Sequence, residues 1–290
     1  MRFAKGHGTG NDFVILPDPD GQLDLAPELV SRLCDRHFGV GGDGVLRVVR
    51  TAMAGPDAQE QQAEWFMDYR NADGTLAEMC GNGVRVFAKY LLEEGLAAGP
   101  ELAVATRAGT RLVRAEADGQ FTVDMGAAVV LGDGVAQAGD QQLAGLAISV
   151  GNPHLACMID QPVAAVDLTD PLVLAPAELT GGANVEVIRP VGDHEIEMRV
   201  HERGSGLTLS CGTGAVAAAV AAAVAVGEWP AGPGLPWTVH VPGGKLAVTP
   251  SGTASLLTGP ADIVAAGELS ASWLAGLSPV GLRYAPASSS

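Results

Sequence analysis

The sequence predicts an α+β protein of two pseudo-symmetric domains, each a mostly antiparallel, barrel-like sheet wrapped around a central helix. Three observations support this prediction: a long internal repeat, short strand patterns separated by turn signals, and few helical segments. Two of the helical segments begin with the same motif, Cys-Gly-x-Gly. It stands at Cys80 in "EMCGNGVRVFAKYLLEEG" and at Cys211 in "LSCGTGAVAAAVAAAVAVG".

The repeat extends upstream of the motif. Asn71 precedes Cys80 by the same interval by which Glu202 precedes Cys211, and each interval contains a glycine turn. Each Cys-Gly-x-Gly is followed by an apolar helical pattern. We therefore expect two similarly folded domains that face each other across a cleft at the N-termini of the paired helices.

A second matched element stands near the start of each proposed half. It reads "GTGNDF", with Asn11, in the first half and "SVGNPH", with Asn152 and His154, in the second. We expect the boundary near Met125-Gly126, which gives domains of residues 1–125 and 126–260. The strand pattern of "ADIVAAGEL" suggests that residues 261–290 return to the first domain.

The helices are predicted from periodicity and punctuation. In "LAPELVSRLCDRHFG", Pro27 suits a first turn, an apolar stripe includes Cys34, His37 and Phe38, and Gly39 ends the helix. Cys34 is therefore expected in the core. The run from Ala215 to Val226 is apolar all round, which predicts a buried helix.

The strands are predicted from alternation. "RLVRAEADGQFTVDMG" contains two alternating runs around Asp118-Gly119, a strong hairpin signal. "HEIEMRVHER" alternates apolar and charged residues in the manner of a half-buried strand. "TAMAGPDAQEQQAE" is polar and is predicted to be a surface loop.

Composition excludes several functional classes. The formal net charge is −16 and the arginines are scattered, so a basic face for nucleic acid is not expected. The apolar run at Ala215 is shorter than the ~20 residues that span a bilayer, and the N-terminus lacks the apolar region of a secretory signal. We expect a cytoplasmic protein that contacts neither nucleic acid nor membrane.

The four cysteines are widely spaced and form no Cys-x2-Cys pair, so neither a disulfide framework nor a structural metal site is expected. Only Lys5, Lys89 and Lys245 are available for a Schiff base. Lys89 falls on a helix and Lys245 at a hairpin, so we expect no pyridoxal phosphate and no other cofactor.

The two Cys-Gly-x-Gly motifs predict a particular chemistry. A helix N-terminus binds anions and lowers the pKa of a thiol placed there. Two such termini could hold one carboxylate with a sulfur on each side, so that one thiolate removes a proton from a carbon and the other thiol returns one to the opposite face. The alternative is that Cys80 and Cys211 are structural thiols in a duplicated fold.

At these residues the chain resembles the diaminopimelate epimerases, cofactor-independent two-cysteine enzymes that interconvert LL- and meso-diaminopimelate. The resemblance runs from end to end and rests on "GHGTGNDF", "FGVGGDG", "YRNADGTLAEMCGNGVR", "GNPH", "GANVE" and "HERGSGLTLSCGTGA". It implies two pseudo-symmetric domains, a homodimer, and Cys80 and Cys211 as the acid and base pair.

The resemblance also implies which residues bind the substrate. It assigns the reacting carboxylate to two short segments, Gly81-Asn82 and Gly212-Thr213. It assigns the rest of the substrate to Asn11, Asn71, Asn152, Asn184, Glu202 and Arg203. His154 is expected to support the site without touching the substrate. For the asparagines turn chemistry is the alternative, and for Glu202-Arg203 a solvated strand end.

Two positions depart from the family pattern. Leu207 stands where the family commonly has Glu, and Gly44 where it often has Gln. Leu207 could alter the substrate range or rate, whereas Gly44 removes one polar contact near the site. Two other functions also stay open. One is a cofactor-independent racemase of another amino acid; the other is a non-catalytic, redox-responsive protein in which Cys80 and Cys211 pair reversibly.

Overall fold

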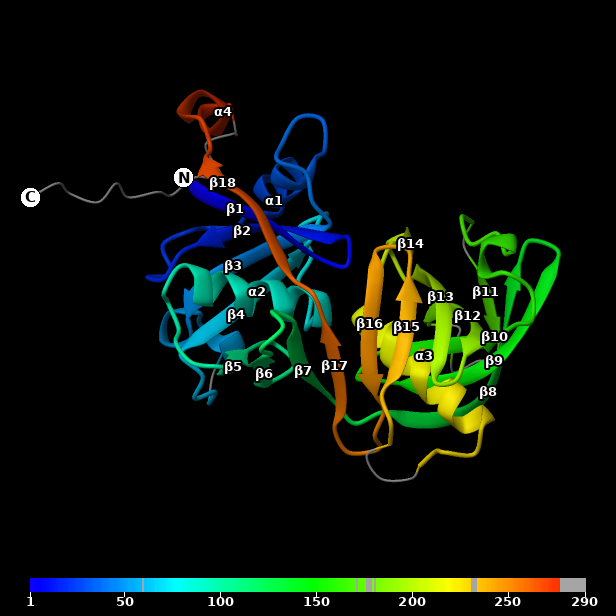
Figure 1. The fold of residues 1–290 in the computed structure, drawn as a ribbon. Helices are drawn as coiled ribbons and strands as arrows, with labels where there is room; N and C mark the ends of the chain where they lie inside the picture. Colours follow the sequence, from blue (N-terminus) through cyan, green and yellow to red (C-terminus); the bar gives the residue numbers. More distant parts are fainter. Residues whose placement is uncertain (59, 171, 176–178, 180, 231–233, 277–290) are drawn as a thin grey trace, which may run out of the picture. The chain divides into compact units, whose positions relative to one another are not determined.

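A computed structural model describes residues 1–58, 60–170, 172–175, 179, 181–230 and 234–276 (Figure 1). Tertiary contacts divide the chain into two compact units. The first unit comprises Met1–Gly8, Asp12–Arg114 and the described chain from Ala261. The second unit comprises Thr9–Asn11 and Ala115–Pro260.

The first unit contains three helices and a mixed set of strands among its described residues. Its elements are β1 (Arg2–Gly8), β2 (Asn11–Pro17), α1 (Pro27–Cys34), β3 (Gly44–Arg50), β4 (Trp65–Asn71), α2 (Gly81–Glu93), β5 (Glu101–Ala105), β6 (Arg111–Ala115), β18 (Asp262–Glu268) and α4 (Ala271–Ala275), with 3₁₀ turns at Thr51–Met53 and Pro56–Ala58. β18 pairs with β1, β3 with β4 and β5 with β6, all antiparallel, whereas β2–β3 and β4–β5 are parallel.

The second unit is built around one helix. Its elements are β7 (Phe121–Gly126), β8 (Val129–Ala138), β9 (Gln141–Ser149), β10 (Pro153–Met158), a 3₁₀ turn (Val163–Ala165), β11 (Val173–Ala175), β12 (Asn184–Gly192), β13 (Glu195–Glu202), β14 (Gly206–Thr208), α3 (Gly212–Ala225), β15 (Trp237–Val241), β16 (Gly244–Thr249) and β17 (Ser255–Gly259). Its pairs are antiparallel except β10–β12 and β13–β15.

Each unit packs strands against a central helix. In the first unit α2 contacts β1, β3, β4, β5 and β18, and in the second unit α3 contacts β9, β10, β12, β13, β15, β16 and β17 (Figure 1). Every residue of α3 from Gly212 to Ala223 is buried, as expected for a helix that is apolar all round. The α+β class, with mostly antiparallel strands and few helices, is confirmed.

The predicted hairpin strands are present at β6 and β7, and Gly119 between them has a φ of 86°, which suits glycine. The domain boundary near Met125-Gly126 stays a prediction. That position lies at the end of β7, inside the second unit. Of residues 261–290, the part that forms β18 pairs with β1, and residues 277–290 lie outside the described chain.

The first helix is shorter than predicted. α1 begins at Pro27 and buries Leu29, Val30, Leu33 and Cys34, but it ends at Cys34 rather than before Gly39. The reason is local: the Asp35 carboxylate accepts hydrogen bonds from the backbone N–H of His37 and of Phe38, at 2.7 and 2.8 Å. This turn competes with the helix.

The prediction that His37 and Phe38 continue the apolar stripe is therefore wrong. Phe38 is 78% exposed.

Candidate functional site

The two cysteines occupy the same position at two helix N-termini. Cys80 is the N-cap of α2, with φ −141° and ψ 120°, and Cys211 is the N-cap of α3, with φ −124° and ψ 120°. Each sulfur accepts a hydrogen bond from the backbone N–H three residues later, from Gly83 and from Gly214, at 3.4 Å in both cases. The internal repeat thus produces two equal helix-capping thiols, one in each unit.

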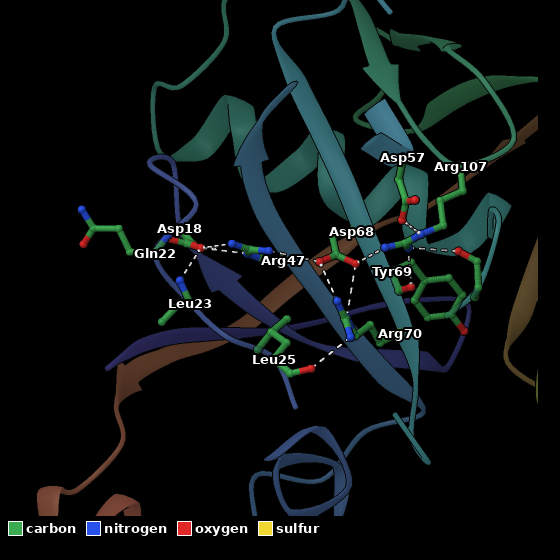
Figure 2. A network of polar contacts seen from close by, with 11 residues as sticks. Asp18, Gln22, Leu23, Leu25, Arg47, Asp57, Asp68, Tyr69, Arg70 and Arg107 are labelled. Carbon is green, nitrogen blue, oxygen red and sulfur yellow. Dashed lines mark hydrogen bonds and ion pairs between the residues drawn. The ribbon is translucent and has the colours of Figure 1, made fainter. Parts of the chain in front are cut away.

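The segment that leads to Cys80 is anchored on a buried cluster of charged side chains (Figure 2). Asp68 of β4 is its centre and contacts Arg47, Arg70 and Arg107 at 3.4, 3.3 and 2.6 Å. Burial by itself would raise the pKa of Asp68, but the charges of Arg107 and Arg70 hold it below its ordinary value. Asp68 is therefore an anion on which three guanidinium groups converge.

Arg107 connects this cluster to the chain just before Cys80. Its Nη1 donates to the carbonyl oxygens of Tyr69 and Ala77, at 3.0 and 3.4 Å, as Figure 2 shows for Tyr69. The backbone N–H of Ala108 donates to the carbonyl of Glu78 at 3.2 Å. Two contacts from one loop therefore hold the segment that enters the helix cap.

The two asparagines expected near Cys80 have local roles of their own. Asn71 ends β4, and its Nδ2 donates to Thr75 Oγ1 at 3.0 Å within the turn that follows, so turn chemistry accounts for this contact. The Asn82 side chain is fully buried, and its Oδ1 accepts a hydrogen bond from Arg85 at 2.9 Å.

Arg85 is a fully buried cation in the first turns of α2. Its Nη1 also donates to the carbonyl of Gly81 at 3.3 Å. Burial lowers its pKa to about 10, and the nearby Cys80 sulfur opposes this shift. Sequence reasoning passed over Arg85; the signal was a cation among the apolar residues of "GVRVFA".

The Cys211 thiol lies in a denser polar environment. The thiol sulfur is 3.5 Å from Thr213 Oγ1, and Asn152 Nδ2 donates to the same hydroxyl oxygen at 3.4 Å. Asn152 Oδ1 is 3.0 Å from His154 Nε2. On the other side of the ring, His154 Nδ1 is 2.7 Å from Glu186 Oε1.

The structure thus brings together four of the predicted residues and adds one that sequence reasoning missed, Glu186. The signal for it was a lone charge in the apolar strand pattern "NVEVI".

Burial raises the pKa of the Cys211 thiol well above its ordinary value, and the charges of Glu202 and Glu186 raise it further. Hydrogen bonds from Thr213 and from the Gly214 N–H act in the opposite direction and do not outweigh them. The expectation that a helix N-terminus lowers the thiol pKa is therefore wrong for Cys211, because desolvation is the larger effect. Cys211 is held as the neutral thiol.

The remaining predicted residues of the second unit lie on β12 and at the end of β13. Asn184, 6% exposed, accepts a hydrogen bond from the Arg203 backbone N–H at 2.9 Å. Glu202 accepts one from Thr208 Oγ1 at 2.5 Å, and burial raises its pKa. The Arg203 residue is exposed, and its Nη1 is 3.4 Å from the carbonyl of Gly182.

The turn that carries Asn11 belongs by its contacts to the second unit. Thr9 has a φ of 51° and Gly10 one of 82°, so the turn adopts a left-handed conformation. Thr9 Oγ1 lies 2.7 Å from the hydroxyl of Ser210, the residue before Cys211. The sequence grouped Asn11 with the first half, and only the folded chain places its turn beside Ser210.

The two departures from the family pattern differ in their surroundings. Leu207 is 41% exposed on β14. At Gly44 a Cβ atom would lie 2.5 Å from the carbonyl oxygen of Arg70 and 2.7 Å from the ring of Tyr69. Gly44 therefore permits a close approach of two strands, in addition to removing a polar contact.

Other site types find no support among the described residues. In the described part of the chain, no three or more His, Cys, Asp or Glu side chains are grouped so that they could hold a metal ion. None of its described helices is long and apolar enough to cross a membrane. The four cysteines all lie among the described residues and form no disulfide, and Cys34 and Cys157 are buried outside the site.

Comparison with known proteins gives a consistent result. A family model described as diaminopimelate epimerase matches residues 3–131 and 146–264. The diaminopimelate epimerase of Thermobifida fusca is 57% identical over 274 residues, which cover 93% of this chain and 98% of the relative. That of Streptomyces coelicolor is 50% identical and covers 96% of this chain and 98% of the relative.

Solved structures show the same fold at low sequence identity. A hydroxyproline epimerase from Agrobacterium vitis, with bound trans-4-hydroxy-L-proline, has a TM-score of 0.65 at 15% identity, covering 97% of this chain and 94% of its own. A predicted epimerase from Pseudomonas aeruginosa has a TM-score of 0.63 at 15% identity, covering 92% and 98%. At this identity the likeness shows the fold alone.

Proposed function

Because the chain belongs to the diaminopimelate epimerase family, we propose that it interconverts LL- and meso-diaminopimelate without a cofactor, by proton transfer between two cysteines and the α-carbon. The observation that carries the two-cysteine mechanism is the repeated cap. Cys80 and Cys211 have the same backbone conformation and the same contact to a helix N–H.

In the proposed reaction one thiolate takes the α-hydrogen as a proton and the other thiol delivers a proton to the opposite face. The reaction requires both thiols to reach the same α-carbon. Because its pKa is raised, Cys211 is protonated before the reaction and can deliver the proton to the α-carbon. Cys80 is then the base that removes the α-hydrogen. After turnover the protonation states are exchanged, which permits the reverse reaction.

The α-hydrogen is weakly acidic, so charge that accumulates on the carboxylate must be stabilised. The first N–H groups of a helix have no intrahelical acceptor, and the helix dipole favours an anion there. We propose that Gly81-Asn82 and Gly212-Thr213 supply this stabilisation through their backbone. At Asn82 the amide side chain points to Arg85, so only its backbone is assigned this role.

The far end of the substrate carries a second ammonium and carboxylate group. We propose that Arg203 binds this carboxylate and Glu202 this ammonium, with Asn11, Asn71, Asn152 and Asn184 as hydrogen-bonding partners. The exposure of the Arg203 residue is consistent with a free guanidinium face for the ligand. A homodimer and a cytoplasmic location, which the family resemblance implies, belong to the same proposal; light scattering would measure the oligomeric state.

The decisive experiment follows LL-diaminopimelate in deuterated water by NMR with reduced protein. We expect stereochemical conversion together with α-deuterium incorporation, and loss of both in Cys80→Ala and in Cys211→Ala. Cys34→Ala and Cys157→Ala are matched controls, because these thiols are buried elsewhere, and both should remain active. Conversion that survives either active-site variant would refute the two-thiol mechanism.

The same experiment separates the alternative functions. No turnover of LL-diaminopimelate by folded, reduced protein would favour another amino acid as substrate. Activity that is lost on oxidation and restored by reductant would indicate that Cys80 and Cys211 form a disulfide as an inactivating side reaction.

A further inference from the structure

Glu186 is a buried carboxylate whose charge helps to raise the Cys211 pKa, but the proposed mechanism assigns no role to its hydrogen bond with His154. It lies on β12 between Val185 and Val187, which are 1% and 0% exposed, and it is itself 0% exposed. One of its oxygens, Oε2, has no hydrogen-bond partner among the described residues. A buried charge is costly unless it is paired, so this residue requires an explanation.

Its position is directly beneath the first turn of α3. A Cβ atom added to Gly214 would lie 2.6 Å from Glu186 Oε1 and 3.2 Å from its carboxyl carbon. Glycine at this position therefore makes room for the carboxylate. The positive end of the helix dipole favours an anion at this point.

A series of polar contacts connects this carboxylate to the thiol. It runs from Glu186 Oε1 to His154 Nδ1 at 2.7 Å, and from His154 Nε2 to Asn152 at 3.0 Å. It continues from Asn152 to Thr213 Oγ1 at 3.4 Å, and from that hydroxyl to the Cys211 sulfur at 3.5 Å. All five residues belong to the second unit.

The chemistry of the first contact determines the state of the ring. A carboxylate can only accept a hydrogen bond, so the Nδ1 atom that faces it carries a proton. The other nitrogen, Nε2, lies 3.0 Å from Asn152 Oδ1, an amide oxygen that can only accept, so the ring donates a hydrogen bond on both sides. The ring is 0% exposed, so bulk solvent does not reach either nitrogen.

We infer that Glu186 is a positioning residue that keeps a proton on His154 Nδ1 and thereby orients the ring and the Asn152 amide beside Cys211. This inference rests on the proposed function for its catalytic consequence, although the proton on Nδ1 does not depend on it. Glu186 touches neither the substrate nor the thiol in this role. It acts through His154.

The test is Glu186→Gln, which keeps the shape of the side chain and removes its charge. A glutamine can turn either its oxygen or its NH₂ group toward Nδ1, so a proton on Nδ1 is no longer required. In protein labelled with ¹⁵N-histidine, we expect the wild type to show a protonated Nδ1 at His154 and the variant to show a change at that nitrogen. The His154 signals are assigned by their absence in His154→Gln.

Kinetics provide the second readout. We expect kcat of Glu186→Gln to fall by about 10- to 100-fold, the effect of losing one hydrogen bond to a charged group. Glu186→Asp keeps a carboxylate and should restore the proton on His154 Nδ1 and part of the rate. The matched control is Glu197→Gln on β13, whose carboxylate pairs with Arg189 at 2.7 Å, and it should leave both readouts unchanged.

Two results would overturn the inference. One is a wild-type His154 protonated only at Nε2; this measurement is made on the wild-type protein and therefore stands even if Glu186→Gln does not fold. The other is a folded Glu186→Gln protein in which the Nδ1 signal of His154 and the rate are those of the wild type. If the wild type itself turns over no diaminopimelate, the proposed function fails while the NMR result still decides the role of Glu186.

Discussion

The second glycine of each Cys-Gly-x-Gly motif offers a matched pair of substitutions, Gly83→Ala and Gly214→Ala. Neither glycine has a positive φ, so alanine is conformationally acceptable at both. At Gly83 the added Cβ would lie 3.4 Å from Cys80 Cβ and from a Leu46 methyl group, which is ordinary contact. At Gly214 it would lie 2.6 Å from Glu186 Oε1, which is far too close.

The expected magnitudes follow from these distances. Alanine in place of glycine stabilises a helix by about 0.5–1 kcal/mol, and this gain applies to both sites. Overpacking a buried site costs about 1–3 kcal/mol and applies only to Gly214, because Glu186 is buried and hydrogen-bonded to His154. Gly214→Ala should therefore be less stable than Gly83→Ala by about 1–3 kcal/mol, since the helix gain cancels in the comparison.

Thermal unfolding of the two variants measures this difference. At about 2–4 °C per kcal/mol, the midpoint of Gly214→Ala should lie about 2–12 °C below that of Gly83→Ala. Gly83→Ala should equal or exceed the wild type. Equal midpoints for the two variants would refute the conclusion that the Glu186 carboxylate fills the space beneath the first turn of α3.

Three further predictions concern the rest of the molecule. Arg107→Gln removes hydrogen bonds to Asp68 and to the segment before Cys80, so the free energy of unfolding, measured by urea titration, should fall by about 1–3 kcal/mol. An unchanged free energy would show that other contacts hold this segment. The lowered pKa of Asp68 means that its contribution to stability is present above its unfolded-state pKa of about 3.9 and is lost as pH falls through the folded-state value. The urea midpoint should therefore drop in acid, and the drop should be smaller in Asp68→Asn. Burial raises the pKa of Cys34 and of Cys157 to about 12, so iodoacetamide at pH 8 should leave both unmodified in the folded protein by mass spectrometry; modification without unfolding would contradict their burial.

Much of the fold follows from local patterns in the chain. The repeated Cys-Gly-x-Gly, the apolar run of α3 and the turn at Asp118-Gly119 each predict a structure that is present, because periodicity and turn chemistry act over a few residues. The end of α1 was predicted incorrectly, because the hydrogen bonds of Asp35 to its own backbone compete with an apolar pattern that continues past it.

The sequence by itself determined that two thiols cap two helices and that the chain belongs to the diaminopimelate epimerase family. Only the tertiary structure decided their environments. Burial beside Glu202 and Glu186 raises the pKa of Cys211, although the helix N-terminus alone would lower it. The tertiary structure also brings Glu186 and His154, which lie on separate strands, into contact. Desolvation and contacts between distant segments depend on the folded chain, so no local pattern contains them.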